Sequence, residues 1–271
     1  MEYLEFILYG LIQGLTEFIP VSSTAHLKII SLLLGLDDPG SSVSAIIQLG
    51  SVFAVVWYFR HVIFKLRNKS SIKVFYHNLN INLLRSIFIS TIPIVFLGGS
   101  IKLFSPYFFE HILRSNTSIA IVSLLMAMFM YIADSSKKGS KNLYNFSNLD
   151  SFLIGFSQAF SIFPGFSRSG VTISTALILG WERNDAAKFS FLLGIPAISL
   201  AAIVEFIYSL NELSTFNFIS LIFGLVSTFL SSLLAIDFFL KYFSSNGLKI
   251  FIIYRIVFAI LILLNLKDFV K

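Results

Sequence analysis

The sequence contains no cysteine and has few charged residues. Without cysteine, the chain forms neither disulfide bonds nor thiolate metal sites. Charged residues make up only 13% of the 271 residues and hydrophobic residues make up 56%, whereas ordinary soluble domains carry about twice that charged share. This composition indicates one polytopic membrane domain over residues 1–271. The N-terminus also lacks a basic region and a small-residue cleavage site, so we interpret it as mature sequence.

The basic residues indicate how the apolar runs cross the membrane. A net charge of +6 would suit nucleic acid in a soluble protein, but here Lys and Arg gather at the ends of apolar runs, so no nucleic-acid partner is expected. If successive runs cross in alternation, thirteen of the twenty basic residues fall on one side. The positive-inside rule makes that side cytoplasmic and places both termini outside. The six expected spans are residues 43–59, 83–104, 116–133, 186–210, 218–240 and 248–266.

Two pairs of shorter apolar segments are interrupted by proline and polar residues. In the first pair, Pro20 ends one helix because the residue before a proline leaves the α region, and Ser22 is an N-cap candidate for the next helix. Helices of about 14 residues reach about 20 Å, less than the roughly 30 Å of a bilayer core. Each pair therefore predicts a re-entrant hairpin. The expected helices are residues 3–18 and 22–35 in the first pair and 151–163 and 167–180 in the second.

The two hairpins follow one pattern. Each half of the chain contains three spans, and because three is odd, the second copy enters the membrane from the opposite face. We therefore expect an all-α fold of inverted repeats, about 1–135 and 148–271, whose hairpin tips meet near the midplane. Matched positions lie 145 residues apart for Gly10 and Gly155, Gln13 and Gln158, Ser22–Thr24 and Ser167–Ser169, and Gly35 and Gly180, and 144 apart for Pro20 and Pro164.

The tip of the second hairpin has the residues of an anion site. Gly165 permits a sharp turn and a close approach of backbone N–H groups to a ligand. A helix that starts at Ser167 aims its unpaired N–H groups and the positive end of its dipole at the same point. Arg168 adds a planar fork suited to phosphate. Further hydrogen bonds can come from the hydroxyls of Ser167, Ser169 and Thr172.

The tip of the first hairpin supplies reactive groups. An unpaired carboxylate is costly in hydrocarbon, so Glu17 needs a partner, a water-filled cavity or a site. Gln13 lies one turn before Glu17 on the same helical face, and Ser22, Ser23 and His26 have similar spacing on the next helix. Beside an anion pocket, these groups can hydrolyse a phosphoanhydride. Either a serine or histidine attacks with the help of a base, or a carboxylate positions a metal ion and water.

Three motifs in the chain resemble those of one family. Gln13 with Glu17, the run Pro20-Val21-Ser22-Ser23-Thr24-Ala25-His26, and the run from Pro164 to Thr172 are similar to motifs of undecaprenyl-pyrophosphate phosphatases of the bacitracin-resistance type. The similarity extends over essentially the whole chain. It implies an enzyme of the bacterial inner membrane that removes the terminal phosphate from undecaprenyl pyrophosphate, which recycles the lipid carrier for cell-wall synthesis and confers bacitracin resistance. It also implies a site that opens toward the outer face.

With this resemblance, we assign roles to the tip residues as a hypothesis. Ser23 is the nucleophile, and Glu17 and His26 handle the proton. Arg168 stabilises the transition state. A phosphohistidine on His26 and direct attack by water stay open as alternatives. The residues expected to bind the substrate are Gln13, Ser22, Thr24, Gly165, Ser167, Ser169 and Thr172.

A divalent cation, magnesium or calcium, is the expected cofactor, because both ions take oxygen ligands. Glu17 is the first candidate ligand. Its neighbour one turn earlier is often glutamate in the resembling proteins and is Gln13 here, which weakens any mechanism with two carboxylates on one ion. Gln13 can still ligate through its amide oxygen or position water. The expected partners are a polyprenyl pyrophosphate lipid, the bilayer and, as a working hypothesis, a second copy in a homodimer.

A secondary transporter or polyprenyl-phosphate flippase is the alternative function, because inverted repeats with broken helices are common in transporters. The enzyme is favoured because an acid, an alcohol and an imidazole exceed what anion binding needs. In a purely structural reading, residues 22–24 form only a helix cap with small residues. For Arg255, we expect a structural role in which it snorkels or pairs with Glu205 or Asp237.

Overall fold

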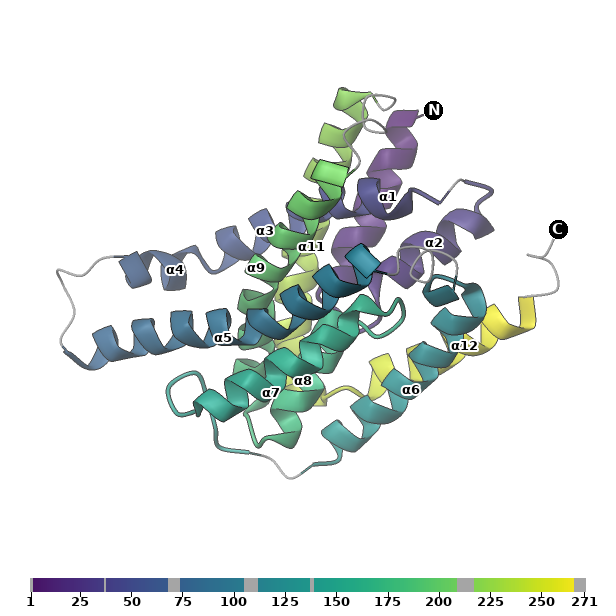
Figure 1. The fold of residues 1–271 in the computed structure, drawn as a ribbon. Helices are drawn as coiled ribbons and strands as arrows, with labels where there is room; N and C mark the ends of the chain where they lie inside the picture. Colours follow the sequence, from purple (N-terminus) through teal and green to yellow (C-terminus); the bar gives the residue numbers. More distant parts are fainter. Residues whose placement is uncertain are drawn as a thin grey trace.

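The protein is built of helices, as a computed structural model of residues 2–36, 38–67, 74–104, 112–136, 139–208 and 217–265 shows (Figure 1). The first half contains α1 (Glu2–Glu17), α2 (Ser23–Leu33), α3 (Gly40–Tyr58), α4 (Arg60–Arg67), α5 (Val74–Phe104) and α6 (Asn116–Asp134). The second half contains α7 (Asn148–Ala159), the 3₁₀ helix η2 (Phe160–Ile162), α8 (Arg168–Ile178), α9 (Arg183–Tyr208), α11 (Phe218–Asn246) and α12 (Lys249–Asn265).

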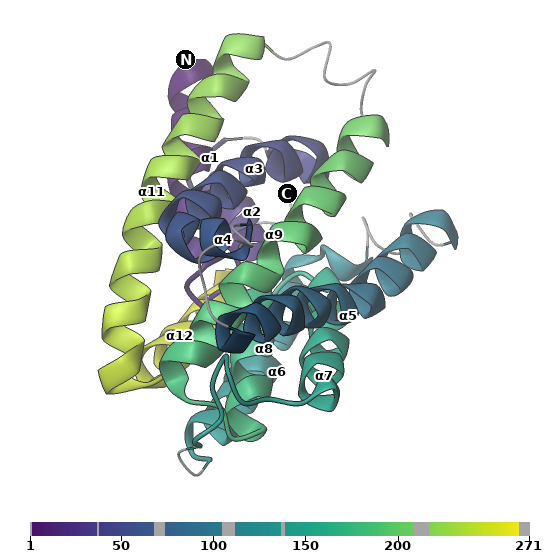
Figure 2. The same ribbon diagram turned by 90° about the vertical axis from the view of Figure 1, so that its left-hand side faces the viewer.

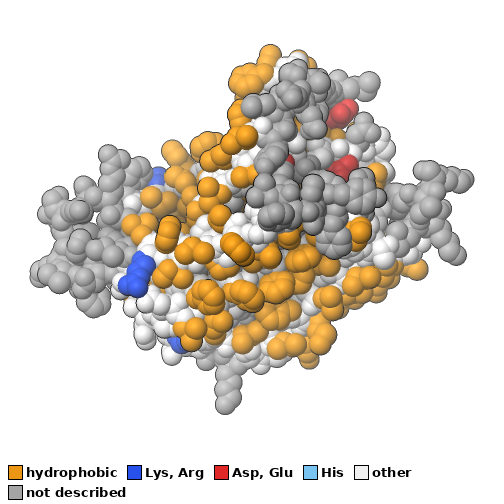
Figure 3. Space-filling view, viewed as in Figure 1, with side chains coloured by type: hydrophobic (Ala, Val, Ile, Leu, Met, Phe, Trp, Pro, Cys, Tyr) orange, Lys and Arg blue, Asp and Glu red, His pale blue; other side chains and the backbone are white. Residues whose placement is uncertain are grey.

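Four helices of the described residues are long and apolar enough to cross a membrane, namely Asn82–Ile101, Asn116–Asp134, Arg183–Ile207 and Phe218–Asn246. A shorter apolar helix, Ser42–Tyr58, matches the expected span 43–59, and the 17 residues of α12 cover most of the expected span 248–266. Hydrophobic side chains cover the middle of the face seen in Figure 3, which suits contact with lipid. The chain is therefore an all-helical membrane protein.

Some features of the expected topology fall outside the described residues. These are the ends of two spans at Leu210 and Leu266, and the basic residues Lys69, Lys73, Lys137, Lys138, Lys267 and Lys271. Two described helices differ from the expected layout. Helix α4, which follows α3 after one residue, was not expected, and α5 begins at Val74, well before the expected start of its span at residue 83.

The backbone of the two hairpin tips takes the same path. Ser22 precedes α2 and Ser167 precedes α8 as N-cap residues, and their φ angles are 77° and 70°. Gly35 and Gly180, which follow the same two helices, have φ angles of 69° and 85°. A left-handed conformation costs an L-residue about 1–2 kcal/mol, so two serines that adopt it at matched positions indicate that both tips need the same sharp turn.

Matched helices also pack in the same way in the two halves. Helix α1 packs along α11, and α7 packs along α5 (Figures 1 and 2). Helix α6 pairs with α12, and α3 pairs with α9. Glycines permit the first two contacts: a Cβ on Gly14 would lie 2.5 Å from the carbonyl oxygen of Thr228, and one on Gly155 would lie 2.7 Å from the carbonyl carbon of Ser90. Such close approach of helix backbones is typical of membrane proteins.

The main hydrophobic core surrounds the hairpin tips with residues from both halves. Phe18, directly after α1, packs edge-to-face on Phe191 of α9 with ring centroids 5.0 Å apart. Phe191 in turn packs against Phe239 of α11, with a centroid distance of 5.8 Å. All three rings are fully buried. Polar groups placed at this level must therefore find partners within the protein.

Candidate active site

Glu17 stands at the centre of a polar cluster where the two hairpins meet. Its carboxylate oxygen Oε2 accepts hydrogen bonds from Gln13 Nε2 at 2.8 Å, Ser23 Oγ at 2.7 Å and Gln48 Nε2 at 2.9 Å. The other oxygen, Oε1, lies 3.2 Å from an amino nitrogen of Arg168. Four donors from α1, α2, α3 and α8 therefore surround one buried carboxylate. The contact with Arg168 joins the two halves of the chain.

Arg168 spans the gap between Glu17 and α9. One amino nitrogen bonds the Glu17 carboxylate, and the other donates to the carbonyl oxygen of Ser190 at 2.8 Å. Its Nε is buried and finds no partner in the part of the chain that the structure describes. Gly194 makes room for the guanidinium, because a Cβ there would lie 2.6 Å from Cζ of Arg168. A phosphate oxygen is the kind of acceptor that such an incompletely paired fork binds.

The start of α8 presents a row of hydroxyls beside Arg168. Ser167 Oγ accepts a hydrogen bond from the N–H of Gly170 at 3.2 Å and lies 3.2 Å from Ser169 Oγ. Ser169 Oγ donates to the carbonyl of Ile19, on the first tip. Thr172 Oγ1 donates to the carbonyl of Arg168 and lies 2.7 Å from Ser190 Oγ, so it braces α8 against α9.

The two tips are also joined directly. The backbone N–H of Gly165 donates to Ser22 Oγ at 3.2 Å, so the Ser22 side chain bonds the opposite hairpin and does not cap its own helix. Arg255 of α12, fully buried, donates to the carbonyls of Pro20 at 3.2 Å, Ser123 at 3.4 Å and Gly165. Arg255 was expected to have a structural role in which it snorkels or pairs with Glu205 or Asp237. Its role is structural, but the guanidinium is buried and bonds carbonyl groups, two of them at the breaks between helices, where carbonyls need a donor.

His26 makes its contacts away from Glu17 and Ser23. Its Nδ1 lies 2.8 Å from the carbonyl oxygen of Ser22, and its Nε2 lies 2.6 Å from the hydroxyl of Tyr254. Since a carbonyl only accepts, Nδ1 donates and Nε2 accepts from Tyr254. The ring stacks on Phe258, with centroids 4.3 Å apart. Helix α12 therefore holds His26 in place. The remaining predicted residue of this tip, Thr24, directly follows Ser23 on α2 and is half-buried.

Sequence comparison places the chain that forms this cluster in a family. A family model described as "Bacitracin resistance protein BacA" matches residues 6–261. The chain belongs to the BacA family. A protein of Prochlorococcus marinus strain MIT 9215 named "Undecaprenyl-diphosphatase" is 71% identical over 266 residues, which cover 98% of this chain and 100% of that protein. A protein of the same name from Prochlorococcus marinus strain MIT 9313 is 44% identical over 258 residues, with 94% and 86% covered.

Within this BacA-family chain, sequence reasoning missed several residues around the cluster. Gln48 is an amide inside the apolar span 43–59, and that signal could have identified it. Ser190 gave no signal, because one serine in a long helix has many structural roles. Tyr254 also gave none, since it precedes Arg255 in an apolar run and its distance from His26 in sequence is large. These contacts depend on how α3, α9 and α12 are rotated about their axes.

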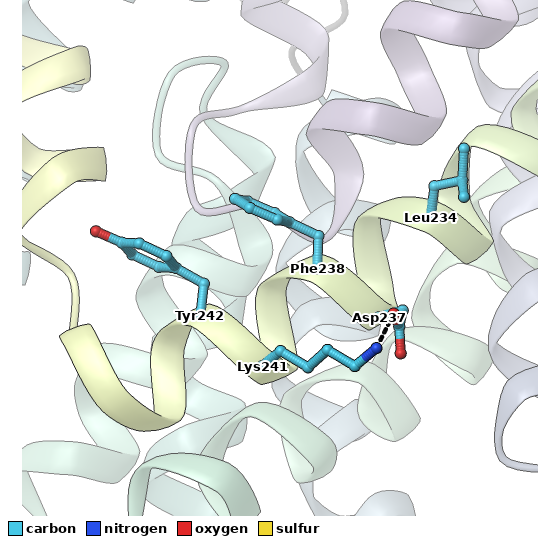
Figure 4. A pocket seen from close by; sticks show the side chains of 5 residues that line it. All are labelled: Leu234, Asp237, Phe238, Lys241 and Tyr242. Carbon is cyan, nitrogen blue, oxygen red and sulfur yellow. Dashed lines mark hydrogen bonds and ion pairs between the residues drawn. The ribbon is translucent and has the colours of Figure 1, made fainter.

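A surface hollow on the BacA-family fold lies apart from the cluster. It is formed on α11 alone by Leu234, Asp237, Phe238, Lys241 and Tyr242 (Figure 4). Lys241 Nζ bonds Asp237 at 2.6 Å, one helical turn away. This hollow contains none of the predicted site residues. Around Glu17, and elsewhere in the described residues, no group of three or more His, Cys, Asp or Glu side chains comes together.

Proposed function

We propose that this membrane protein is an undecaprenyl-diphosphatase, which hydrolyses undecaprenyl pyrophosphate to undecaprenyl phosphate and inorganic phosphate. The observation that carries the proposal is a buried carboxylate that touches both a serine hydroxyl and an arginine, at the start of two helices. Two helix N-termini and a guanidinium favour a pyrophosphate group, and the Ser23–Glu17 hydrogen bond of 2.7 Å is the geometry of a nucleophile with its base. Membership of the BacA family supports the lipid substrate.

The reaction follows from these contacts in two steps. Ser23 Oγ forms a bond to the terminal phosphorus, while the bond from that phosphorus to the bridging oxygen breaks and undecaprenyl phosphate leaves. The Ser23 proton passes to Glu17 and then to the leaving phosphate. Water next forms a bond to the phosphorus of the phosphoserine and gives its proton to Glu17, while the bond from that phosphorus to Ser23 Oγ breaks; Ser23 regains a proton from Glu17 and inorganic phosphate leaves. Arg168 and the N–H groups at the start of α8 stabilise the charge that develops on the phosphoryl oxygens.

His26 is the rival nucleophile, and the geometry favours Ser23. Both ring nitrogens of His26 are engaged, one by a carbonyl and the other by Tyr254, whereas Ser23 already donates to a carboxylate. We propose that His26 assists proton handling indirectly by holding the start of α2. Rapid quenching with labelled substrate, followed by peptide mapping, identifies a phosphorylated Ser23 or His26. The assignment to Ser23 fails if the label is on His26, or if no label accumulates and S23A keeps the full rate.

A divalent cation, magnesium or calcium, is the proposed cofactor. Glu17 is the sole carboxylate in the described cluster, and four donors occupy its oxygens. A single carboxylate suits an ion that takes most of its oxygen ligands from pyrophosphate and water, with one or two from the protein. Glu17 and the amide oxygen of Gln13 would hold it there. When bound, the ion neutralises charge on the phosphate oxygens.

The proposed topology places this site within one membrane domain. Six spans and two re-entrant hairpins form inverted repeats, about 1–135 and 148–271, with both termini and the mouth of the site outside. The matched φ angles of the two tips and the matched helix pairs support it. Single cysteines are informative probes because the chain has none: labelling of residues 2 and 140 by a membrane-impermeant thiol reagent should differ between intact cells and inverted vesicles. We also propose that the protein forms a homodimer, which cross-linking can test.

One assay separates hydrolysis from transport. Purified protein in detergent is given undecaprenyl pyrophosphate, with no membrane and no gradient, and released phosphate is measured. An enzyme releases phosphate under these conditions, while a secondary transporter or flippase does not. The E17Q and S23A proteins, purified in the same way, control for contaminating phosphatases. The proposal fails if all three proteins give the same rate.

A further inference from the structure

We propose that Gln48 of α3 is a positioning residue, which holds the Glu17 carboxylate in the orientation that Ser23 needs. This inference rests on the proposed role of Glu17 as the base. Gln48 lies outside both hairpins, and its amide nitrogen is 2.9 Å from Glu17 Oε2, the same oxygen that accepts the Ser23 hydroxyl at 2.7 Å. Gln48 is half-buried, whereas Gln13 and Glu17 are almost fully buried.

The four donors to Glu17 are not equivalent during the reaction. Ser23 gives up its proton when it attacks, and Arg168 turns part of its fork to the phosphate. Gln13 stays, but it lies one turn away on the same helix and therefore moves together with Glu17. Of the donors in the described residues, Gln48 alone is fixed to another helix and has no role in the chemistry. Its hydrogen bond from a neighbouring helix therefore keeps Oε2 of Glu17 directed at Ser23.

The helix that carries Gln48 is tightly held next to α1. A Cβ on Gly50 would lie 2.5 Å from the carbonyl oxygen of Leu225 and 2.8 Å from Cβ of Thr228. A Cβ on Gly14 of α1 would lie 2.5 Å from the carbonyl oxygen of that same Thr228. Helices α1 and α3 therefore contact the same turn of α11, through residues one position from Gln13 and two positions from Gln48. This packing fixes the backbone that carries Gln48 relative to the backbone that carries Glu17.

The second half of the chain provides an internal comparison. Aligning Gly50 with Gly194 places Leu192 at the position of Gln48, and the 145-residue offset places Ile162 at the position of Glu17. Gln158, the counterpart of Gln13, is still a glutamine. The half that lacks the carboxylate thus lacks the amide on the third helix as well, which is expected if Gln48 serves Glu17 and not the packing of α3.

The test is a mutant cycle on purified protein with undecaprenyl pyrophosphate as substrate. Q48L keeps the side-chain size and removes the donor, and it should lower kcat by about 10- to 100-fold, the value of a hydrogen bond to a charged group. KM should stay within about twofold, since Gln48 is assigned no contact with substrate. In the E17Q background, Q48L should cause no further loss, because its effect passes through the carboxylate.

The matched control is Q158L, which removes a buried glutamine whose Nε2 makes one long bond of 3.4 Å to the carbonyl of Ser90. It should keep kcat within about twofold. The proposal is overturned if Q48L keeps the wild-type kcat, if it raises KM alone, or if Q158L loses as much activity. An equal loss from Q48L in the wild-type and E17Q proteins would also overturn it, because Gln48 would then act independently of Glu17.

A second measurement covers the case in which E17Q is too slow for kinetics. The thermal unfolding midpoints of wild type, Q48L, E17Q and the double variant form the same cycle without activity. Destabilisation by Q48L should be smaller in E17Q than in wild type; additive shifts overturn the contact. If wild type releases no phosphate, the proposed function fails and the positioning role fails with it. If wild type is active and E17Q matches it, Glu17 is not the base and only the positioning proposal fails.

Discussion

The two hairpin tips share a backbone but carry different chemistry. In both, a serine with positive φ precedes an 11-residue helix that points its first N–H groups toward the meeting point. The first tip contributes an acid and a hydroxyl, Glu17 and Ser23. The second contributes a cation, Arg168, at the position that matches Ser23 in the repeat. The same turn and helix start are thus present twice, while the acid, the hydroxyl and the cation are each present once.

This difference teaches that the cluster is assembled across the two halves. Neither hairpin alone contains both charges of the Glu17–Arg168 contact. Each buried charge would lack its main partner if the other hairpin moved away, and an unpaired buried charge is strongly unfavourable. The link between the tips therefore holds the fold together and, in the proposed mechanism, is also part of the chemistry.

The largest expected effect comes from removing the hydroxyl of the first tip. S23A should lower kcat by about 10⁴-fold, because it removes the nucleophile and leaves only the binding frame. Phosphate release from undecaprenyl pyrophosphate measures it. The control is S31A, the same change on the same helix at a buried hydroxyl that has no partner in the described residues. A loss of less than tenfold for S23A contradicts the assignment.

Removing the cation of the second tip tests the link between the halves. R168A should lower kcat by about 10³-fold through lost charge stabilisation. It should also destabilise the protein by about 3–5 kcal/mol, because Glu17 is left buried without its cation. The double variant E17A/R168A should regain part of that stability but no activity, which thermal unfolding and phosphate release report together. A double variant less stable than either single variant contradicts a direct charge link.

A smaller effect is expected from the glycine behind Arg168. G194A should lower kcat/KM by roughly 10- to 100-fold, because a new Cβ displaces the guanidinium from Glu17 and from the phosphate. The loss should shrink in the R168K background, where no guanidinium occupies that space. The control is G99A on α5, where a Cβ meets nothing within 4 Å. If G194A costs the same in both backgrounds, the glycine serves another contact.

The smallest expected effect distinguishes the two serines that precede α2 and α8, Ser22 and Ser167. S167A removes the hydrogen bond to Gly170 N–H and should destabilise the protein by about 1 kcal/mol, the value of a typical N-cap. S174A, at a buried hydroxyl of α8 without a partner in the described residues, should be neutral. S22A removes no cap bond and breaks the contact to Gly165, so it should raise KM more than S167A does. Equal effects on KM contradict the distinct roles of the two side chains.

Much of this arrangement could be predicted because its signals are local. Proline after an apolar run predicts a helix end, and a small polar residue beyond it predicts the next helix start, so both hairpins were expected close to their observed bounds. The costly charges of Glu17 and Arg168 in apolar surroundings indicated partners, and their spacing in matched motifs indicated that they meet. These inferences need no knowledge of how distant helices pack.

The remainder could not be predicted because it depends on the rotation of each helix about its axis. The amide of Gln48 in an apolar span was a signal for a buried partner but did not name that partner, and Ser190 lies on a long apolar helix where sequence does not show which face turns toward the tips. Arg255 was expected to snorkel or to pair with a carboxylate. Asp237 bonds Lys241 one turn away, and Arg255 binds the carbonyls of the broken helices. His26 was grouped with Ser23 by spacing alone, whereas stacking on Phe258 directs its ring to α12.

The contacts of Arg255 make the joining of the two tips depend on α12. Helix α12 follows both hairpins in the chain, and the guanidinium of its Arg255 holds carbonyls of both tips. A nascent chain that has inserted every earlier helix still lacks this clamp. A chain that stops before α12 therefore carries Glu17 and Ser23 without the donor that fastens the two tips together.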